Sequence, residues 1–419
     1  AVDADELPDL AGLPWPAIGP WTERVAASRL VAVGEGSGEG GESSRPLRLL
    51  GSWLYLDRYW REERQVAADL RSLSERPPGD VRTDVLADGL ERLFAGADAA
   101  SRQRLAAATA VRRRLAVVAG GPGTGKTTTV ARIVALLYEQ AEAAGGAVPL
   151  VALAAPTGKA AARLEEAVHD AARVLPVGPA IAARLLGLEA STLHRLLGWR
   201  PDSRSRFRHH RGQRLPHDVV VVDETSMVSL SLMARLIESI RPDARLILVG
   251  DPGQLASIEA GAVLGDIVGP ATGGPGPGRA AEPGLSGRPA ADAAGIGEGI
   301  VVLDRIHRFG GGIARAAEAI RRGDGDELMA ELRTGREGVL WIPTDLTEES
   351  ALAPVRARAV AAGRAVAEAA RAGETTAALD ALASFRVLCA HRRGGQGVAR
   401  WTASIEGWLA AEVDGFVAD

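Results

Sequence analysis

The sequence predicts an α/β fold in which helices cover a parallel β-sheet. Between residues 101 and 345, short apolar runs alternate with stretches of helical periodicity, and each run ends in a polar or glycine-rich segment. Continuous apolar runs are typical of strands buried on both faces, and the loops at their carboxyl ends commonly carry functional groups. The predicted strands are residues 115–119, 150–154, 219–222, 246–249 and 300–303.

The segments on either side of this core predict smaller units. Residues 1–100 contain a polar loop, a cluster of aromatic residues and an amphipathic helix at 58–73, and we expect them to form a small N-terminal domain that docks a partner. Residues 346–419 predict two alanine-rich helices and then a strand at 385–390. Because one strand and a helix cannot enclose a core, we expect 346–419 to hold linker helices and the start of an incomplete second domain.

The composition excludes several classes of protein. The chain has 419 residues and a net charge of −4, so any binding of nucleic acid must come from local patches rather than from overall charge. Cys389 is the only cysteine, which excludes an internal disulfide and a zinc cluster. No apolar run approaches the roughly 20 residues that cross a bilayer, and no leader pattern opens the chain. We therefore expect a cytoplasmic protein without a membrane partner.

All but two of the 49 basic residues are arginines, and the two lysines are Lys126 and Lys159. An ammonium is a compact point charge and a guanidinium is a planar fork, so we expect each lysine to mark a place that requires a small cation. Lys126 lies in GGPGTGKTT, between the strand at 115–119 and a helix predicted at 127–140. This context is typical of a P-loop, whose backbone N–H groups and helix N-terminus hold phosphates.

The P-loop predicts a RecA-like P-loop NTPase core that uses ATP and Mg²⁺. We expect Lys126 to reach the β- and γ-phosphates and Thr127 to place its hydroxyl on Mg²⁺. A chance glycine-rich turn is the alternative interpretation. The nucleotide-binding residues predicted in this loop are Gly120, Gly121, Pro122, Gly123, Thr124, Gly125, Lys126, Thr127 and Thr128.

Two further strands end in polar residues that suit the same chemistry. The strand at 219–222 is followed by Asp223, a ligand for Mg²⁺, and Glu224, a base that activates the attacking water. The strand at 246–249 is followed by a sharp turn that presents Gln254, whose amide can hydrogen-bond the γ-phosphate or the attacking water. A solvated acidic pair and a plain turn are the alternatives.

Two insertions interrupt the predicted core. Residues 191–217 hold seven arginines against one acidic residue, with Trp199 and Phe207 between them. Arginines neutralise phosphates and aromatic rings stack on bases, so this basic segment suits contact with DNA. A solvated hairpin is an equal alternative for the arginines, and we expect Trp199 to pack in the core. The Gly/Pro-rich stretch at 269–299 predicts a loop.

In their order along the chain, these segments resemble the motifs of superfamily 1 helicases. The DETSM, TLHRLLG and HRF segments are similar to those of the RecD family, the alpha subunits of exodeoxyribonuclease V. The resemblance covers about residues 50–400 and is most specific over 115–268. It implies a 5′–3′ ATP-dependent DNA helicase that processes double-strand ends for recombinational repair, in a heterotrimer with a beta and a gamma subunit.

The resemblance also implies roles for individual residues. It makes Gln103 the reader of adenine and Arg308 the arginine that reaches the γ-phosphate. An exposed helical glutamine and a capping or salt-bridged arginine are the respective alternatives. The single-stranded DNA contacts that the resemblance implies fall at two segments, namely Pro156, Thr157 and Lys159, and then Thr192 and His194.

Three other functions stay open at this point. A stand-alone RecD-like helicase would carry the same motifs, although such proteins tend to have a longer N-terminal region. A P-loop kinase acting on a small molecule explains Lys126 and Asp223 but not Gln254 or the basic segment. An inert binding module is the third, because the family's later motifs have no match before Asp419. For that reason we expect the chain alone to bind ATP weakly and not to unwind DNA.

Overall fold

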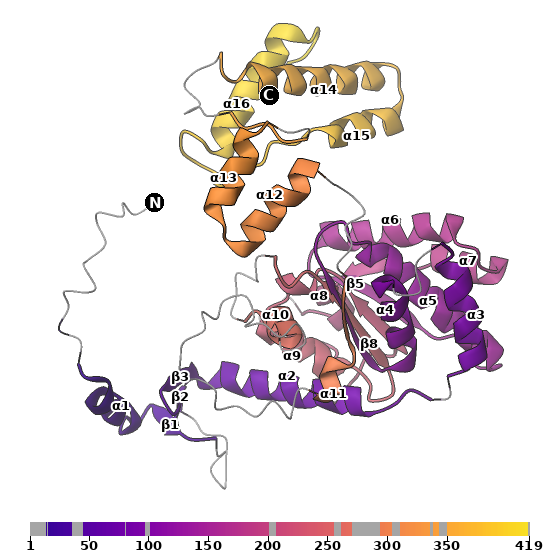
Figure 1. Cartoon of the computed structure of the whole chain (residues 1–419), viewed down its shortest axis with the longest axis vertical. Helices are drawn as coiled ribbons and strands as arrows, with labels where there is room; N and C mark the ends of the chain where they lie inside the picture. Colours follow the sequence, from indigo (N-terminus) through magenta and orange to yellow (C-terminus); the bar gives the residue numbers. More distant parts are fainter. Residues whose placement is uncertain are drawn as a thin grey trace. The chain divides into compact units, whose positions relative to one another are not determined.

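The structure is a computed structural model that divides into two compact units, Ala1–Phe309 and Gly310–Asp419 (Figure 1). The residues that the structure describes are 14, 16–35, 45–79, 81–96, 101–200, 207–254, 261–269, 294–303, 311–335, 338–342 and 350–417.

The first unit is built on a six-stranded sheet whose strand order is β6-β5-β7-β8-β4-β9. Every neighbouring pair in it is parallel, which confirms the predicted α/β class and its RecA-like arrangement. All five predicted strands form, and β6 is an additional short strand. The bounds are β4 Leu115–Gly120, β5 Val151–Ala155, β6 Ala190–Thr192, β7 Val219–Val222, β8 Arg245–Gly250 and β9 Ile300–Leu303.

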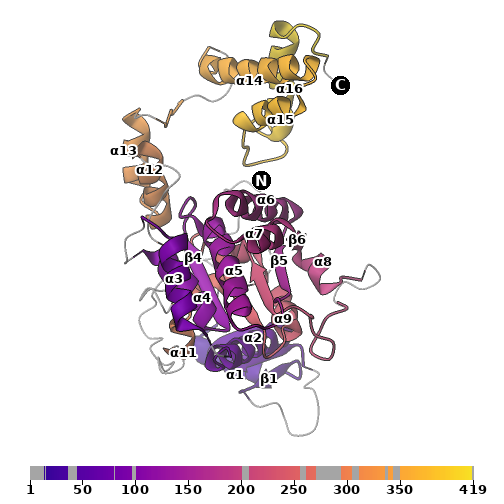
Figure 2. The same ribbon diagram turned by 90° about the vertical axis from the view of Figure 1, so that its right-hand side faces the viewer.

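Helices cover both faces of this sheet (Figures 1 and 2). One face packs against α3 Thr83–Leu93, α4 Arg102–Arg112, α5 Lys126–Ala143, α6 Gly158–Val174 and α7 Pro179–Leu186. The other packs against α2 Asp57–Glu75, α8 Leu193–Leu197, α9 Leu230–Ser239 and α10 Val263–Val268. A short helix, α11 Ala294–Gly297, precedes β9 and lies against α2.

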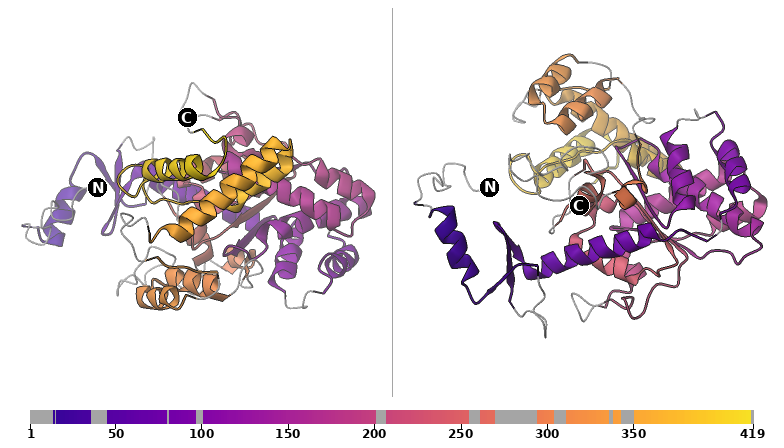
Figure 3. Two further views of the ribbon diagram at one scale, coloured as in Figure 1. Left: turned by 90° about the horizontal axis from the view of Figure 1, so that it is seen from above. Right: turned by 60° about the horizontal axis from the view of Figure 1, so that its bottom comes forward.

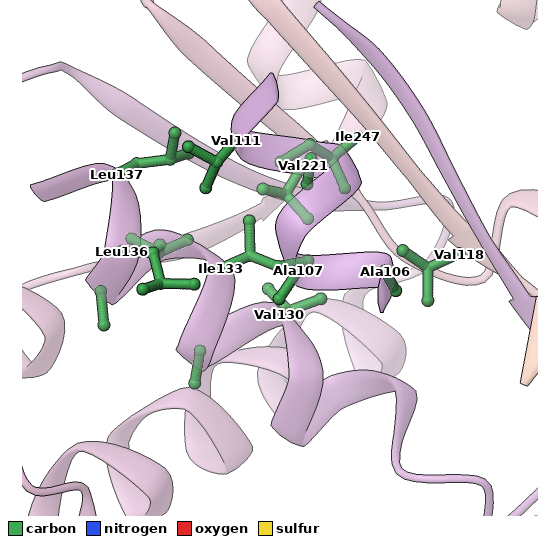
Figure 4. Packing of buried hydrophobic residues seen from close by; sticks show 14 of the residues in the cluster. Ala106, Ala107, Val111, Val118, Val130, Ile133, Leu136, Leu137, Val221 and Ile247 are labelled. Atoms are coloured by element: carbon green, nitrogen blue, oxygen red, sulfur yellow. The ribbon is translucent and has the colours of Figure 1, made fainter. Parts of the chain in front are cut away.

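The buried core is split between the two faces because successive strand residues point to opposite sides of a sheet. In β4, Val118 joins the cluster formed with α4 and α5. Figure 4 shows two other members of this cluster, Ala107 and Ile133, close to each other. Its neighbour Val117 joins the cluster formed with α2 and α9. The two faces of the sheet are therefore both buried, and the loops after the strands lie at its carboxyl edge.

The N-terminal part of the first unit is a small sheet that leads directly into α2 (Figure 3). The amphipathic helix predicted at 58–73 is confirmed as α2, and its apolar residues bury in the same cluster as α9. The buried Arg48 pairs with Asp57 at 2.7 Å and stacks on Trp60. The elements before α2 are α1 Ile18–Ala26, β1 Val31–Val33, β2 Leu47–Leu50 and β3 Trp53–Leu56.

The second unit is helical in its described residues. Its two predicted alanine-rich helices form as α14 and α15, and the buried residues gather around Trp408. The strand predicted at 385–390 is wrong, because that segment forms no strand and Leu388 is 92% exposed. A strand needs a neighbour for its backbone hydrogen bonds, and the described part of this unit offers none. Its helices are α12 Gly311–Arg322, α13 Gly325–Arg333, α14 Ala353–Arg371, α15 Thr375–Ser384 and α16 Val398–Glu412.

The domain boundaries expected at residues 100 and 345 stay predictions. In the described part of the chain, no helix has both the length and the apolarity to cross a bilayer.

Candidate nucleotide-binding site

Three adjacent strands deliver the expected nucleotide-binding residues to one edge of the sheet. β7, β8 and β4 are consecutive in the strand order, and all three run parallel. The P-loop follows β4, Asp223 and Glu224 follow β7, and the turn that contains Gln254 follows β8. Parallel strands end at the same edge, so these groups converge there.

The backbone of the P-loop requires glycine at several positions. Gly123 and Gly125 have φ values of 76° and 78°, in the left-handed region that side chains disfavour. At Gly120, an added Cβ would lie 2.8 Å from the Oγ1 of Thr124. That hydroxyl donates to the carbonyl of Gly121 at 2.8 Å and tightens the turn. The loop then enters α5 with its N–H groups directed at the carboxyl edge, the arrangement that binds phosphate.

The ammonium of Lys126 folds back over this loop. It donates to the carbonyls of Gly120 at 2.7 Å and Gly121 at 2.9 Å. Burial lowers the pKa of Lys126. The carboxylates of Asp251, Asp223 and Glu224 oppose that shift, so three negative groups surround one compact cation.

Asp223 is a buried acid of the site, with 8% of its surface exposed. Burial raises the pKa of its carboxyl to about 6, and the N–H of Glu224 and the charge of Lys126 oppose the rise. Its Oδ1 accepts the hydrogen bond from Glu224 N at 2.8 Å. A buried carboxylate of this kind is stabilised by a cation that replaces its lost hydration.

Glu224 adopts a strained backbone. Its φ of 51° lies in the left-handed region, and among the described residues it is the one non-glycine residue with a positive φ. This conformation costs an L-amino acid roughly 1–2 kcal/mol. The turn Thr225–Met227 follows at once, and the Thr225 hydroxyl donates to the carbonyl of Val222 at 3.0 Å. Such strain persists where surrounding contacts fix a functional side chain.

The loop after β8 is a side-chain-stabilised turn. The Oδ1 of Asp251 accepts from Gly253 N at 2.9 Å, and Gln254 N donates to the Asp251 carbonyl. This leaves the Gln254 side chain exposed at the carboxyl edge, as expected. Asp251 itself is buried and acts on the charge of Lys126. Asp251 was not predicted from the sequence, although its place after β8 matches that of Asp223 after β7.

The expected DNA-contact segments lie at the next two strands, β5 and β6. Ala155 and Thr192 pair across these strands, so the two segments leave the sheet side by side. Thr157 caps α6 by accepting from Ala160 N at 3.2 Å, and Thr192 caps α8 by accepting from Arg195 N at the same distance. Each hydroxyl is therefore engaged in fixing a helix start.

His194 joins an aromatic cluster on the surface. Its ring centroid lies 5.8 Å from that of Phe207 and 6.5 Å from that of Trp199. Trp199 pairs with Phe207 in an isolated bridge and is 46% exposed, so the expected core packing of Trp199 is wrong. The bridge lies beyond the C-terminal end of α8.

Comparisons with known proteins agree with this geometry. The family described as AAA domain matches residues 103–260. The chain is 48% identical over 408 residues to the RecBCD enzyme subunit RecD of Mycolicibacterium smegmatis, which covers 97% of this chain and 64% of that relative. It is 47% identical over 418 residues to the same subunit of Mycobacterium tuberculosis H37Rv, covering 98% of this chain and 64% of the relative. Over nearly its whole length, the chain is therefore similar to RecD subunits of RecBCD enzymes.

The chain spans 64% of the length of these two curated relatives. It is also 36% identical over 214 residues to the ATP-dependent RecD2 DNA helicase of Deinococcus radiodurans, covering 50% of this chain and 25% of that protein. Among solved structures, Pif1 helicase from Candida albicans aligns with 57% of this chain and 48% of its own, at 17% identity and a TM-score of 0.33.

The structure describes Gln103 but not Arg308, and the RecD resemblance implies a role for both residues. Gln103 on α4 is half-buried, and its Nε2 donates to the carbonyl of Thr124 at 2.8 Å, so it lies against the P-loop. Arg308 lies outside the described residues, as does most of the Gly/Pro-rich stretch at 269–299. The roles of all these residues stay predictions.

Proposed function

We propose that this chain is the motor of a 5′–3′ ATP-dependent DNA helicase, acting as the alpha subunit of exodeoxyribonuclease V on double-strand DNA ends. The convergence at the sheet's carboxyl edge supports this most directly. Strands β7, β8 and β4 bring a P-loop, a carboxylate pair and an exposed glutamine together. The adjacent strands β5 and β6 are followed by α6 and α8, whose first turns carry Lys159 and His194, and both side chains are exposed.

The proposed chemistry is hydrolysis of ATP. Lys126 exchanges its backbone carbonyls for the phosphates, which are stronger, charged acceptors. Glu224 takes the proton of the attacking water, and Arg308 and Lys126 stabilise the charge on the transferred phosphoryl group. Gln254 contacts that group and links it to the DNA side of the edge.

The residues present fit a magnesium ion. The buried carboxyl of Asp223, whose pKa burial raises to about 6, gains from a neighbouring cation. The described residues hold no group of three His, Cys, Asp or Glu that would bind a metal alone. A site with so few protein ligands suits Mg²⁺, which completes its shell with phosphate oxygens and water. Asp223 and the Thr127 hydroxyl would hold it, and the ion would neutralise charge on the phosphates.

The proposed partners are the beta and gamma subunits of the heterotrimer, together with single- and double-stranded DNA. The relatives' names support this, since both mycobacterial proteins are called RecBCD enzyme subunits. The N-terminal part exposes large apolar side chains, including Trp21 at 52% and Trp53 at 46%. An exposed apolar surface of this kind suits a protein interface. We infer that the N-terminal elements dock a partner subunit.

The test is steady-state ATPase activity with and without single-stranded DNA, on a chain that extends to the full length of the relatives. We expect strong stimulation by DNA, loss of turnover in Glu224→Gln, and normal turnover in Glu166→Gln, the same change at an exposed position on α6. DNA-independent turnover would favour a small-molecule kinase. Full activity as a lone monomer, without co-purifying subunits, would favour the stand-alone RecD-like helicase.

A further inference from the structure

Arg132 occupies an unusual position on α5, behind the P-loop. Its guanidinium lies 4.8 Å from the ring centre of Phe94, which is 4% exposed and follows the last residue of α3. Its Nε is buried without a hydrogen-bond partner, and burial lowers its pKa. Among the residues that the structure describes, it forms no ion pair. A cation held in this way is costly, so a structural role in charge pairing does not explain it.

The group that Arg132 does contact is the side-chain amide of Gln103. Its Nη1 lies 3.5 Å from the Gln103 Oε1, a long hydrogen bond. On its other side, the same amide donates from Nε2 to the carbonyl of Thr124 at 2.8 Å. The two contacts agree on one orientation. A flipped amide would set oxygen against the Thr124 carbonyl and NH₂ against the guanidinium.

The orientation leaves a defined hydrogen-bonding face. A glutamine amide has two N–H donors and two acceptor lone pairs, and the protein uses one of each. One donor and one acceptor of Gln103 remain for a ligand. Adenine presents a matching pair, the N6 amino donor and the N7 acceptor, whereas guanine presents two acceptors, O6 and N7, along the same edge.

We propose that Arg132 is a positioning residue that fixes the amide of Gln103 and so makes the nucleotide site prefer adenine over guanine nucleotides. This rests on the proposed function, since it takes the P-loop to bind a nucleoside triphosphate. Phe94 helps to hold the guanidinium in place, since its ring centre lies 4.8 Å from it. The preference is therefore set from behind the loop by a residue that does not touch the base.

The experiment compares the binding of ATP, GTP and inorganic tripolyphosphate to the 419-residue chain by titration calorimetry. The wild-type chain is expected to bind ATP more tightly than GTP. Arg132→Ala should reduce that ratio by about tenfold, the effect of one misplaced hydrogen bond, and leave tripolyphosphate affinity unchanged. Arg132→Lys, which keeps a donor, should restore part of the ratio. Phe94→Leu should lower the ratio of ATP affinity to GTP affinity, as Arg132→Ala does, but by less.

Arg112→Ala is the matched control, because Arg112 is exposed on the same helix as Gln103 and should leave all three affinities unchanged. An unchanged ATP-to-GTP ratio in Arg132→Ala would overturn the inference, as would a parallel loss of tripolyphosphate affinity, which would assign Arg132 to the packing of the P-loop. Equal binding of ATP and GTP by the wild type would also overturn it. Failure of the wild type to bind any of the three ligands would instead reject the proposed function.

Discussion

The ammonium of Lys126 donates to the carbonyl of Gly120 at 2.7 Å, so the P-loop holds its lysine with its own backbone. A second bond runs to Gly121, and carboxylates face the same charge. Two carbonyls one residue apart suit a compact ammonium, whereas a planar guanidinium is larger and directs its donors outward. This contact gives a physical reason why lysine survives here in a chain whose basic residues are nearly all arginine.

Lys126→Arg should therefore behave almost like Lys126→Ala, although it keeps the charge. We expect either change to lower ATPase kcat/KM by about a hundredfold or more, the usual effect of removing a group that stabilises transition-state charge. Lys159→Arg is the matched control, because Lys159 is exposed and its exchange should leave DNA-independent turnover intact. An arginine at 126 that supported normal turnover would show that charge alone suffices there.

The strained backbone of Glu224 predicts a conflict between stability and activity. Glu224→Gly removes a left-handed L-residue that costs roughly 1–2 kcal/mol, and loses about half of that gain to the greater freedom of glycine when unfolded. We expect the free energy of unfolding to rise by about 0.5–1 kcal/mol while hydrolysis is lost. Denaturant titration, read at the first unfolding transition, measures the free energy of unfolding.

Glu166→Gly distinguishes the effect of backbone strain at Glu224 from the general effect of replacing glutamate by glycine. Glu166 is an exposed residue within α6, so Glu166→Gly should destabilise the protein by about 1 kcal/mol. Two Glu→Gly changes of opposite sign would identify the backbone conformation of Glu224 as the cause. Destabilisation at both positions would mean that contacts of the Glu224 side chain outweigh its strain.

Much of the fold followed from the apolar runs, because buried parallel strands lack alternation and stand out from amphipathic helices. β6 was missed, since a three-residue strand that includes Ser191 carries too little apolar signal. The strand predicted at 385–390 failed for the opposite reason. Its residues suit a strand, but strand formation depends on a neighbour, which local sequence does not report.

The candidate site also contains residues that the sequence predicts and residues that it does not. The glycines and Lys126 were predictable because the P-loop is one continuous segment with a fixed backbone requirement. Asp251 was not, since its approach to Lys126 depends on β8 lying beside β4 in the sheet. The contact of Arg132 with Gln103 is equally hidden, because it joins two helices whose packing sets the distance.

The buried carboxyl of Asp223 predicts a pH dependence of stability in the metal- and nucleotide-free chain. Its pKa is raised from 3.8 to about 6 in the folded protein, so the folded state binds the extra proton between these values. Stability therefore falls as pH rises from about 4 to 6, by up to about 3 kcal/mol from this group, and stays lowered above that range. Equilibrium unfolding at several pH values, with a chelator present, measures it.

Asp223→Asn should remove this penalty, because a neutral amide can still accept the hydrogen bond of Glu224 N without carrying a buried charge. We expect the variant to be more stable than the wild type at pH 7 and equal to it near pH 4. Asp170→Asn, at an exposed position on α6, should keep the wild-type pH profile. Parallel profiles for Asp223→Asn and the wild type would show that another group titrates.

Lys159 predicts a second conflict between stability and function. It is the second residue of α6, where the helix dipole disfavours a cation, and it is exposed with no ion pair among the described residues. The same helix end attracts phosphate. Lys159→Gln should therefore stabilise the protein by about 0.3–1 kcal/mol and weaken single-stranded DNA binding. The slope of log K against log salt should fall in magnitude by about 0.7, the contribution of one phosphate contact.

Arg173→Gln provides the comparison, because Arg173 lies in the last turn of the same helix, where a cation is favourable. That variant should lose a little stability and keep the DNA affinity and salt slope of the wild type. Filter binding at four salt concentrations, with unfolding measured in parallel, tests both variants. If Lys159→Gln kept the wild-type slope, Lys159 would not contact a phosphate, and the DNA path would have to run along Thr192 and His194 alone.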